Sequence, residues 1–205
     1  TGTVVNTNTD LTRMWSDIYV AIRDANNVIA NVQTIDMDES LKLRIIGEAR
    51  FLRALHYFNL VRCFGEVPLR IEPLKAGDDE GLPVSSIQDV FAVIVTDLEF
   101  AAENCWGKNE IKNKYSNDLG RATKTAAHAL LAKAYLRIAE EWGKLSYCKR
   151  KQVGAIIVKD RMIISDGYNG TPTGFENFCE DDEGYTKWYV LHAEANAISK
   201  VASST

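Results

Sequence analysis

The chain has no excess of basic residues and no long apolar run. Lys and Arg number 24 and Asp and Glu number 28 among 205 residues, which gives a formal net charge of -4. Without a basic excess, we expect neither binding to a nucleic-acid polymer nor a polybasic contact with a membrane surface. No stretch approaches the roughly 18 consecutive apolar residues of a membrane span, so we expect no such span.

Cysteine is scarce, and its spacing excludes the common paired motifs. The 4 cysteines are far apart, and none forms a C-x-x-C pair. We therefore do not expect a disulfide framework. The first residues have neither the basic start nor the apolar core of a signal peptide. As it is written, the sequence predicts a cytoplasmic protein.

Apolar residues recur at steps of three and four along the first part of the chain, which is the spacing of amphipathic helices. One such segment covers residues 10–32, and Trp15 and Tyr19 lie on its apolar face. We expect this pair to belong to the core rather than to a sugar-binding surface. A second segment covers 45–61 and ends at Gly65, a residue type that commonly terminates helices.

Two further helices are predicted before residue 135. Ser85 and Gln88 have the spacing of a capping box, and the apolar period continues over 91–101. Thr123 opens the last segment, whose apolar positions lie between 127 and 134. The first part of the chain therefore predicts an all-helical bundle.

The string GEARFLRALHYFNLVRCFGEVPL at 47–69 resembles the most recognisable motif of the SusD/RagB-like family of outer-membrane glycan-binding lipoproteins. Residues 25–29 (ANNVI) and 120–136 (GRATKTAAHALLAKAYL) follow the order found in that family. The resemblance implies tetratricopeptide-like helical pairs over residues 1–135. It also implies an address at the outer-membrane surface, with glycans and an outer-membrane transporter as partners. Because these segments support the fold in the family, no glycan-binding residue carries over.

The helical period continues where the resemblance changes. Apolar residues at 127, 131, 134, 138, 142 and 145 keep steps of three and four. We therefore expect one unbroken helix across residues 132–142, joining the two parts of the chain.

Residues 136–205 have a different pattern. Two apolar, β-branched runs at 153–158 and 162–167 flank a short charged turn, which predicts a β-hairpin. The glycine- and proline-rich string GYNGTPTG at 167–174 predicts a shaped loop. An Ala-rich segment after residue 191 predicts a final helix.

His192 and Glu194 form an H-x-E motif at the start of this final helix. In cytidine deaminases the histidine of this motif binds zinc, and the glutamate moves protons without binding the metal. Residues two apart near a helix start diverge by roughly 200°, so an imidazole and a carboxylate can address different sides of one metal-bound water. The motif therefore predicts His192 as a zinc ligand and Glu194 as a catalytic residue.

The sequence from SYCKRKQVGAIIVKD through GYNGTP to HAEANA resembles bacterial deoxycytidylate deaminases of the cytidine-deaminase-like superfamily. The resemblance covers about a third of the chain. It implies a Zn²⁺ cofactor and a deoxycytidine nucleotide as substrate. It also implies that Asn169 and its loop contact the nucleotide and that Arg150 contacts the phosphate. The alternatives for these two residues are loop shaping and surface charge.

The family's other zinc ligands are the cysteines of a later P-C-x-x-C segment, and residues 1–205 contain no such segment. Catalytic zinc normally has three protein ligands. We therefore expect the deaminase-like part to be incomplete. We also expect the unpaired edge strand of its hairpin to pair with another strand, such as one from a second copy of the chain. Cys148 and Cys179 are expected to be structural, with a second metal site as the alternative.

The predicted fold is α+β: a helical bundle over 1–135, followed over 136–205 by a truncated deaminase-like module of helix, β-hairpin and helix. Three hypotheses for function stay open at this point. The first is a zinc-dependent deaminase of the dCMP-to-dUMP type that is incomplete as written. The second is a SusD-like glycan-binding scaffold. The third is a non-functional joining of two unrelated fragments.

Overall fold

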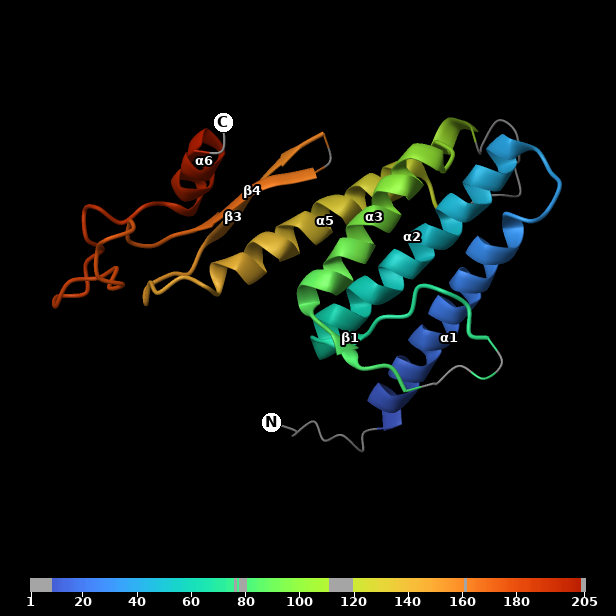
Figure 1. Cartoon of the computed structure of the whole chain (residues 1–205), viewed down its shortest axis with the longest axis horizontal. Coiled ribbons are helices and arrows are strands. Elements are labelled where there is room, and N and C mark those ends of the chain that lie inside the picture. Colours follow the sequence, from blue (N-terminus) through green and yellow to red (C-terminus); the bar gives the residue numbers. More distant parts are fainter. Residues whose placement is uncertain (1–8, 76, 78–80, 111–119, 161, 204–205) are drawn as a thin grey trace. The chain divides into compact units, whose positions relative to one another are not determined.

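The computed structural model describes residues 9–75, 77, 81–110, 120–160 and 162–203 (Figure 1). The chain separates into two compact units, Thr1–Ala134 and Tyr135–Thr205. Long helices dominate the first unit, whereas the second holds a β-hairpin with helices. The α+β fold class is therefore confirmed.

Three helices form most of the first unit: α1 (Thr9–Val32), α2 (Glu39–Phe64) and α3 (Ile87–Asn104). Helix α2 lies between the other two (Figure 1), so its apolar residues occur on more than one face. The fully buried side chains come from all three helices and include Ile22, Tyr57, Leu60, Ile94 and Leu98.

The helix ends follow local sequence signals, with one correction. Helix α2 ends at Gly65, as predicted, because this residue has φ 75°, a left-handed value that favours glycine. The capping box predicted at Ser85 is wrong by one residue. Ser86 caps α3 by accepting a hydrogen bond from the Asp89 N–H at 3.1 Å. Ser85 is unavailable because it pairs with Val67 in a short sheet.

This sheet, which the sequence analysis did not predict, consists of β1 (Val67–Pro68) and β2 (Val84–Ser85) in antiparallel pairing. Polar side chains of the helices hold the segment that follows β1. The Tyr57 hydroxyl both donates to the Arg70 carbonyl at 2.8 Å and accepts from its N–H at 2.7 Å. The Tyr19 hydroxyl donates to the Pro68 carbonyl at 2.7 Å. Buried polar groups thus fix the connection to the helices.

Helix α5 (Lys124–Gly143) runs without a break across residues 132–142, which confirms the predicted continuity. The Thr123 hydroxyl accepts a hydrogen bond from the Ala126 N–H at 3.2 Å and thereby caps its start. The division between the two units, at Ala134 and Tyr135, falls inside this helix.

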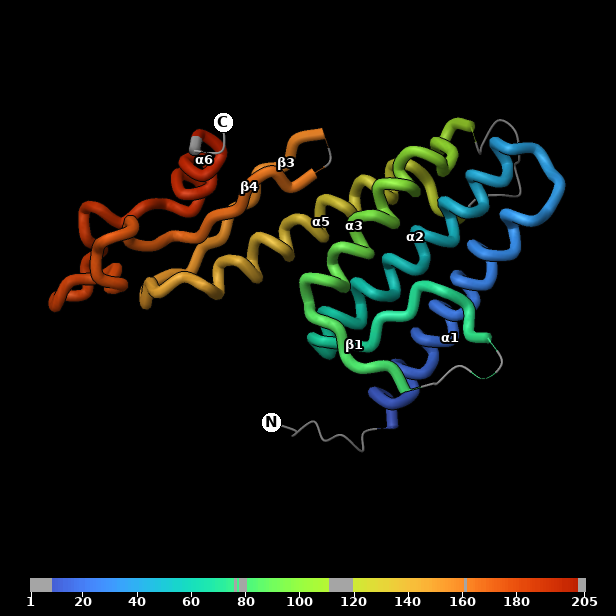
Figure 2. The backbone as a smooth tube through the Cα atoms, viewed as in Figure 1, coloured from blue at the N-terminus to red at the C-terminus, as the bar shows by residue number. Residues whose placement is uncertain are grey.

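The second unit contains the predicted hairpin of β3 (Gly154–Lys159) and β4 (Met162–Tyr168), followed by α6 (Ala193–Ser203). Within the described part of the chain, each of these strands pairs with the other alone. Figure 2 shows the long irregular segment, in orange and red, that connects β4 to α6.

Helix α6 packs closely on the hairpin because Gly167 has no side chain. A Cβ atom at Gly167 would lie 2.6 Å from the Ala197 nitrogen and would collide with the Ala193 carbonyl oxygen. The Ser165 hydroxyl donates to the Ala197 carbonyl at 2.7 Å. This contact fixes the start of α6, and with it the candidate site, against β4. Among the described helices, none is long and apolar enough to cross a membrane.

Candidate functional site

The predicted catalytic motif lies at the start of α6, as the sequence indicated. His192 directly precedes the helix and Glu194 is its second residue, and both residues are exposed. The His192 carbonyl accepts a hydrogen bond from the Asn196 N–H at 3.0 Å, so the first turn of the helix fixes its backbone. The two side chains are therefore accessible to a ligand.

Backbone pairing brings the loop of the GYNGTP motif beside this helix start. Gly170 and Leu191 exchange two hydrogen bonds, with N–O distances of 3.1 and 2.9 Å. The Asn196 side-chain amide donates to the Tyr168 carbonyl at 2.9 Å. Leu191, which precedes His192, is thus hydrogen-bonded to Gly170, which follows Asn169.

The Asn169 side chain shapes this loop. Its amide oxygen accepts from the Val153 N–H at 2.8 Å, and its amide nitrogen donates to the Lys151 carbonyl at 2.8 Å. Its backbone carbonyl accepts from the Ser146 hydroxyl at 2.6 Å. An asparagine amide has a second N–H and a second lone pair, so Asn169 can also hydrogen-bond to a nucleotide. That contact is a proposal.

Arg150 is exposed, and its backbone is held by a carboxylate that the sequence analysis did not identify. Glu180 Oε1 accepts from the Lys149 N–H at 3.0 Å and from the Arg150 N–H at 3.1 Å. The hydrogen bond from Arg150, followed by that from Lys149, lowers the pKa of the Glu180 carboxyl from its ordinary value. A carboxylate 30 residues away in sequence has no local signal, so only the folded chain reveals it.

Cys148 and Cys179 form a disulfide between Cα atoms 5.0 Å apart. The expectation that the chain forms no disulfide is therefore wrong for this pair, because folding brings together two cysteines separated by 31 residues. The structural role expected for the pair agrees with this bond. A metal role would require two reduced thiols, since a disulfide has no thiolate to offer a metal.

The donors that zinc would require are not assembled in the described residues. Over that part of the chain, no group of three or more His, Cys, Asp or Glu side chains is placed to hold a metal ion. His192 is one donor of the expected type, but a single imidazole does not make a catalytic zinc centre. The residues present therefore do not fit the metal by themselves.

The first unit contains a groove of about 380 Å³ between α1 and the connection after β1. Its lining includes Trp15, Tyr19, Pro68 and Arg70. The ring centroids of Trp15 and Tyr19 are 5.0 Å apart, and both residues are half-buried. The pair lines one wall of the groove, and Trp15 also packs edge-on against Phe64, with ring centroids 5.0 Å apart.

The two units match different families. Residues 2–136 match the family described as starch-binding proteins associating with the outer membrane, the SusD-like family. Residues 130–205 match the cytidine and deoxycytidylate deaminase zinc-binding region. The two matches overlap within α5.

Individual relatives show the same division. A SusD-like protein of Bacteroides ovatus is 36% identical over 130 residues, which are 62% of this chain and 22% of that protein. An uncharacterized deaminase of Aliivibrio fischeri is 43% identical over 68 residues, which are 33% of this chain and 46% of that protein. The chain thus spans less than half of either relative.

A solved structure supports the fold of the first unit. The SusD-like carbohydrate-binding protein of Bacteroides fragilis aligns with a TM-score of 0.62 at 29% identity. The alignment covers 68% of this chain and 26% of that protein.

Proposed function

The chain belongs to the SusD-like family through residues 2–136 and carries the zinc-binding region of cytidine and deoxycytidylate deaminases over 130–205, and from this premise we propose that its second unit is one part of a dCMP-deaminating centre. In this proposal His192 is one zinc ligand, Glu194 moves protons, and residues 1–205 alone do not complete the centre. The observation that carries the proposal is the position of His192 and Glu194, exposed at the start of α6 beside the Asn169–Gly170 loop.

Hydrolytic deamination consumes one water and releases ammonia. It requires a group that carries protons from the water to the ring nitrogen and to the leaving amine. Glu194 is an exposed carboxylate at the position where the deaminase motif has this group. Asn169 and Arg150 are proposed to contact the deoxynucleotide and its phosphate, and Glu180 holds the backbone of Arg150 for that contact.

Zinc content and turnover of the 205-residue chain test the incompleteness. We expect substoichiometric zinc and no release of ammonia from dCMP, because His192 lacks partner donors in the described residues. The matched control is His128→Ala, which removes another exposed histidine, one in the first unit. One zinc per chain that is lost in His192→Ala but kept in His128→Ala, together with ammonia release, would show that the centre is complete.

A second experiment tests the deaminase assignment. A segment with the P-C-x-x-C cysteines of a deoxycytidylate deaminase is added in frame after residue 205, to supply the missing donors. We expect zinc binding and dCMP-dependent ammonia release, which Glu194→Gln lowers by about 10²–10⁴-fold. Stoichiometric zinc without any turnover of dCMP would reject the assignment.

For the first unit we propose a scaffold function of the SusD type, in which the groove beside Trp15 contacts glycan. The observation that favours it is the paired aromatic wall of the groove, since aromatic rings offer apolar faces to sugar rings. Affinity electrophoresis in starch tests it, with retardation expected for the natural chain and lost in Trp15→Ala. Equal migration of the two proteins would contradict the proposal.

The proposals for the first and the second unit are both made for one polypeptide. Peptide mapping of the natural protein should therefore yield a peptide that spans residues 134–138. If the two units occur only on separate chains, the hypothesis of two unrelated joined fragments is correct instead.

A further inference from the structure

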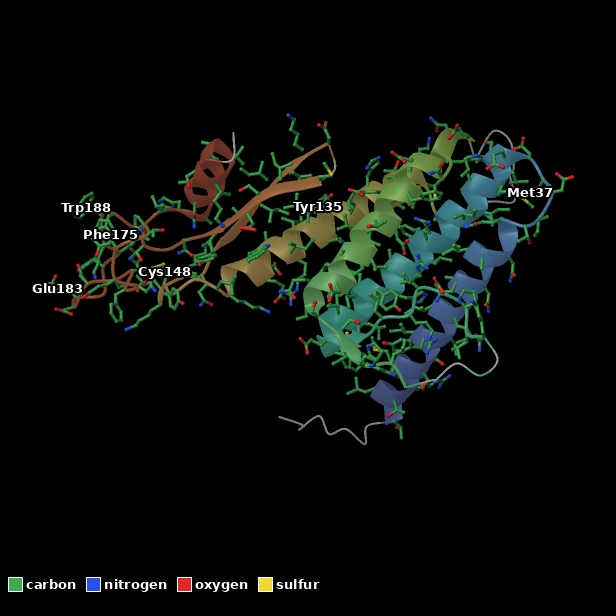
Figure 3. All side chains as sticks on the ribbon, in the orientation of Figure 1. Met37, Tyr135, Cys148, Phe175, Glu183 and Trp188 are labelled. Carbon is green, nitrogen blue, oxygen red and sulfur yellow. A yellow bond between two sulfur atoms is a disulfide. The ribbon has the colours of Figure 1, made fainter. Side chains whose placement is uncertain are left out.

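Two buried cysteines lie near the Asn169 loop of the candidate site without belonging to its proposed chemistry. Cys148 and Cys179 are 5% and 0% exposed. Their disulfide joins the turn after α5 to the long segment between β4 and α6. Figure 3 labels Cys148, which lies near the loop that carries Phe175, Glu183 and Trp188.

We propose that this disulfide is a redox-sensitive clamp that fixes the Asn169–Gly170 backbone and, through it, the position of His192. The inference concerns the geometry of the loop and does not depend on whether the chain deaminates a nucleotide.

The first half of the clamp connects Cys148 to Asn169. The Cys148 N–H donates to the Ser146 hydroxyl oxygen at 3.1 Å, and the same hydroxyl donates to the Asn169 carbonyl at 2.6 Å. The sulfur of Cys148 lies 3.7 Å from that carbonyl oxygen. A displacement of Cys148 therefore acts directly on the backbone of Asn169, and Gly170 then bonds to Leu191, next to His192.

The second half connects Cys179 to the segment that leads to His192. The Cys179 carbonyl accepts from the Lys187 N–H at 2.8 Å, and the neighbouring Glu180 accepts from the N–H groups of Lys149 and Arg150. The disulfide thus joins the turn that contacts Asn169 to the segment that leads to His192. Breaking it leaves the hydrogen bonds at Asn169 in place, but around Cys179 it removes the covalent link beside the exposed hydrogen bonds of Glu180.

Reduction also changes the chemistry at Asn169. In the disulfide, Cys148 has no S–H, whereas a reduced thiol can donate to the Asn169 carbonyl and compete with Ser146.

The disulfide forms by thiol–disulfide exchange with a small disulfide such as oxidised glutathione. Two protein thiols form one S–S bond, and the oxidant is reduced to two small thiols that take up both protons.

The family of the first unit bears on the redox state expected for this disulfide. Disulfides persist in oxidising compartments, and the first unit belongs to a family that associates with the outer membrane. The clamp is expected to be closed in such a compartment and open where thiols are kept reduced.

Hydrogen exchange of the full chain, measured in oxidised and reduced glutathione, tests the clamp. The reporters are the N–H groups of Gly170 and Leu191, because each bonds to the other residue's carbonyl. Buried Leu60 and Ile94 in the first unit serve as internal references. Cys179→Ser is the variant that cannot close, and Cys63→Ser is its matched control, since Cys63 is a free and exposed cysteine.

We expect exchange at Gly170 and Leu191 to become at least about tenfold faster on reduction and in Cys179→Ser, with no change at the references or in Cys63→Ser. Thiol titration of the unfolded oxidised chain should find two of the four cysteines free. Equal exchange in both redox states, or four free thiols after oxidation, would overturn the proposal.

Two other results would also overturn it. Global exchange of β3, β4 and α6 on reduction would make the disulfide a requirement for folding rather than a local clamp. Stoichiometric zinc bound by the reduced chain and lost in Cys179→Ser would make the pair a metal site.

Discussion

Arg53 and Asp97 form a bidentate ion pair in the first unit, with N–O distances of 2.7 and 2.8 Å, and their side chains are 7% and 2% exposed. The guanidinium also donates to Asn26 Oδ1 and to the Ile71 carbonyl, both at 2.8 Å. This arginine therefore connects α1, α2, α3 and the segment that forms the groove.

Removal of Asp97 should destabilise the first unit strongly. Asp97→Ala leaves a buried guanidinium without its counter-charge, which costs about 3–5 kcal/mol of unfolding free energy. Urea unfolding followed by helix ellipticity measures the loss. The matched control is Asp17→Ala, which removes the carboxylate of an exposed pair with Arg13, where we expect less than about 1 kcal/mol. Equal losses in the two variants would contradict the role given to burial.

Gly167→Ala should detach α6 from the hairpin. The added Cβ would collide with backbone atoms of α6, which cannot move aside like a flexible side chain, so we expect a cost of about 3 kcal/mol. Gly170→Ala is the control in the same segment, because its Cβ would meet only the Tyr168 ring, at 3.8 Å. Hydrogen exchange of the α6 amides measures the difference. Similar exchange in both variants would show that the close approach at Gly167 is unimportant.

The contact of Glu180 with the Arg150 backbone should weaken in acid. Because folding lowers the pKa of this carboxyl, its stabilising effect is complete above the unfolded value of about 4.3 and is lost as the pH falls through the lower folded value. The backbone amide shifts of Lys149 and Arg150, followed by NMR, should report this transition. Glu180→Gln should abolish it while keeping an acceptor oxygen. A midpoint at or above the ordinary value would contradict the prediction.

The two free cysteines should differ in reactivity. Burial, and then the nearby Glu48 carboxylate, raises the pKa of Cys105 to about 12, whereas Cys63 is exposed. Since the thiolate is the nucleophile, native alkylation near about pH 8 should label Cys63 at least about 100-fold faster than Cys105. Mass spectrometry of peptides after brief labelling measures the two rates. Comparable rates would show that the first unit opens readily around Cys105.

Local patterns predicted the elements because their signals lie within a few residues. The periods of three and four gave α1 to α3 and the unbroken α5, and Gly65 marked the end of α2. The short charged turn gave the β3–β4 hairpin. His192 and Glu194 were placed at the start of α6 because the Ala-rich segment that follows residue 191 is typical of a helix. The capping box was predicted one residue early, since pairing of Ser85 in β2 has no signal within its own segment.

The sequence by itself determined the helices, the β3–β4 hairpin and the chemical types at the candidate site, since periodicity, capping residues and short motifs act over one or two helical turns. Tertiary structure alone decided which distant groups meet: Cys148 with Cys179, Glu180 with the Arg150 backbone, and Arg53 with Asp97. It also decided that Trp15 and Tyr19 line a groove beside the connection after β1. The physical reason is that such contacts depend on the path of the whole chain, and a residue's own neighbours in sequence carry no record of that path.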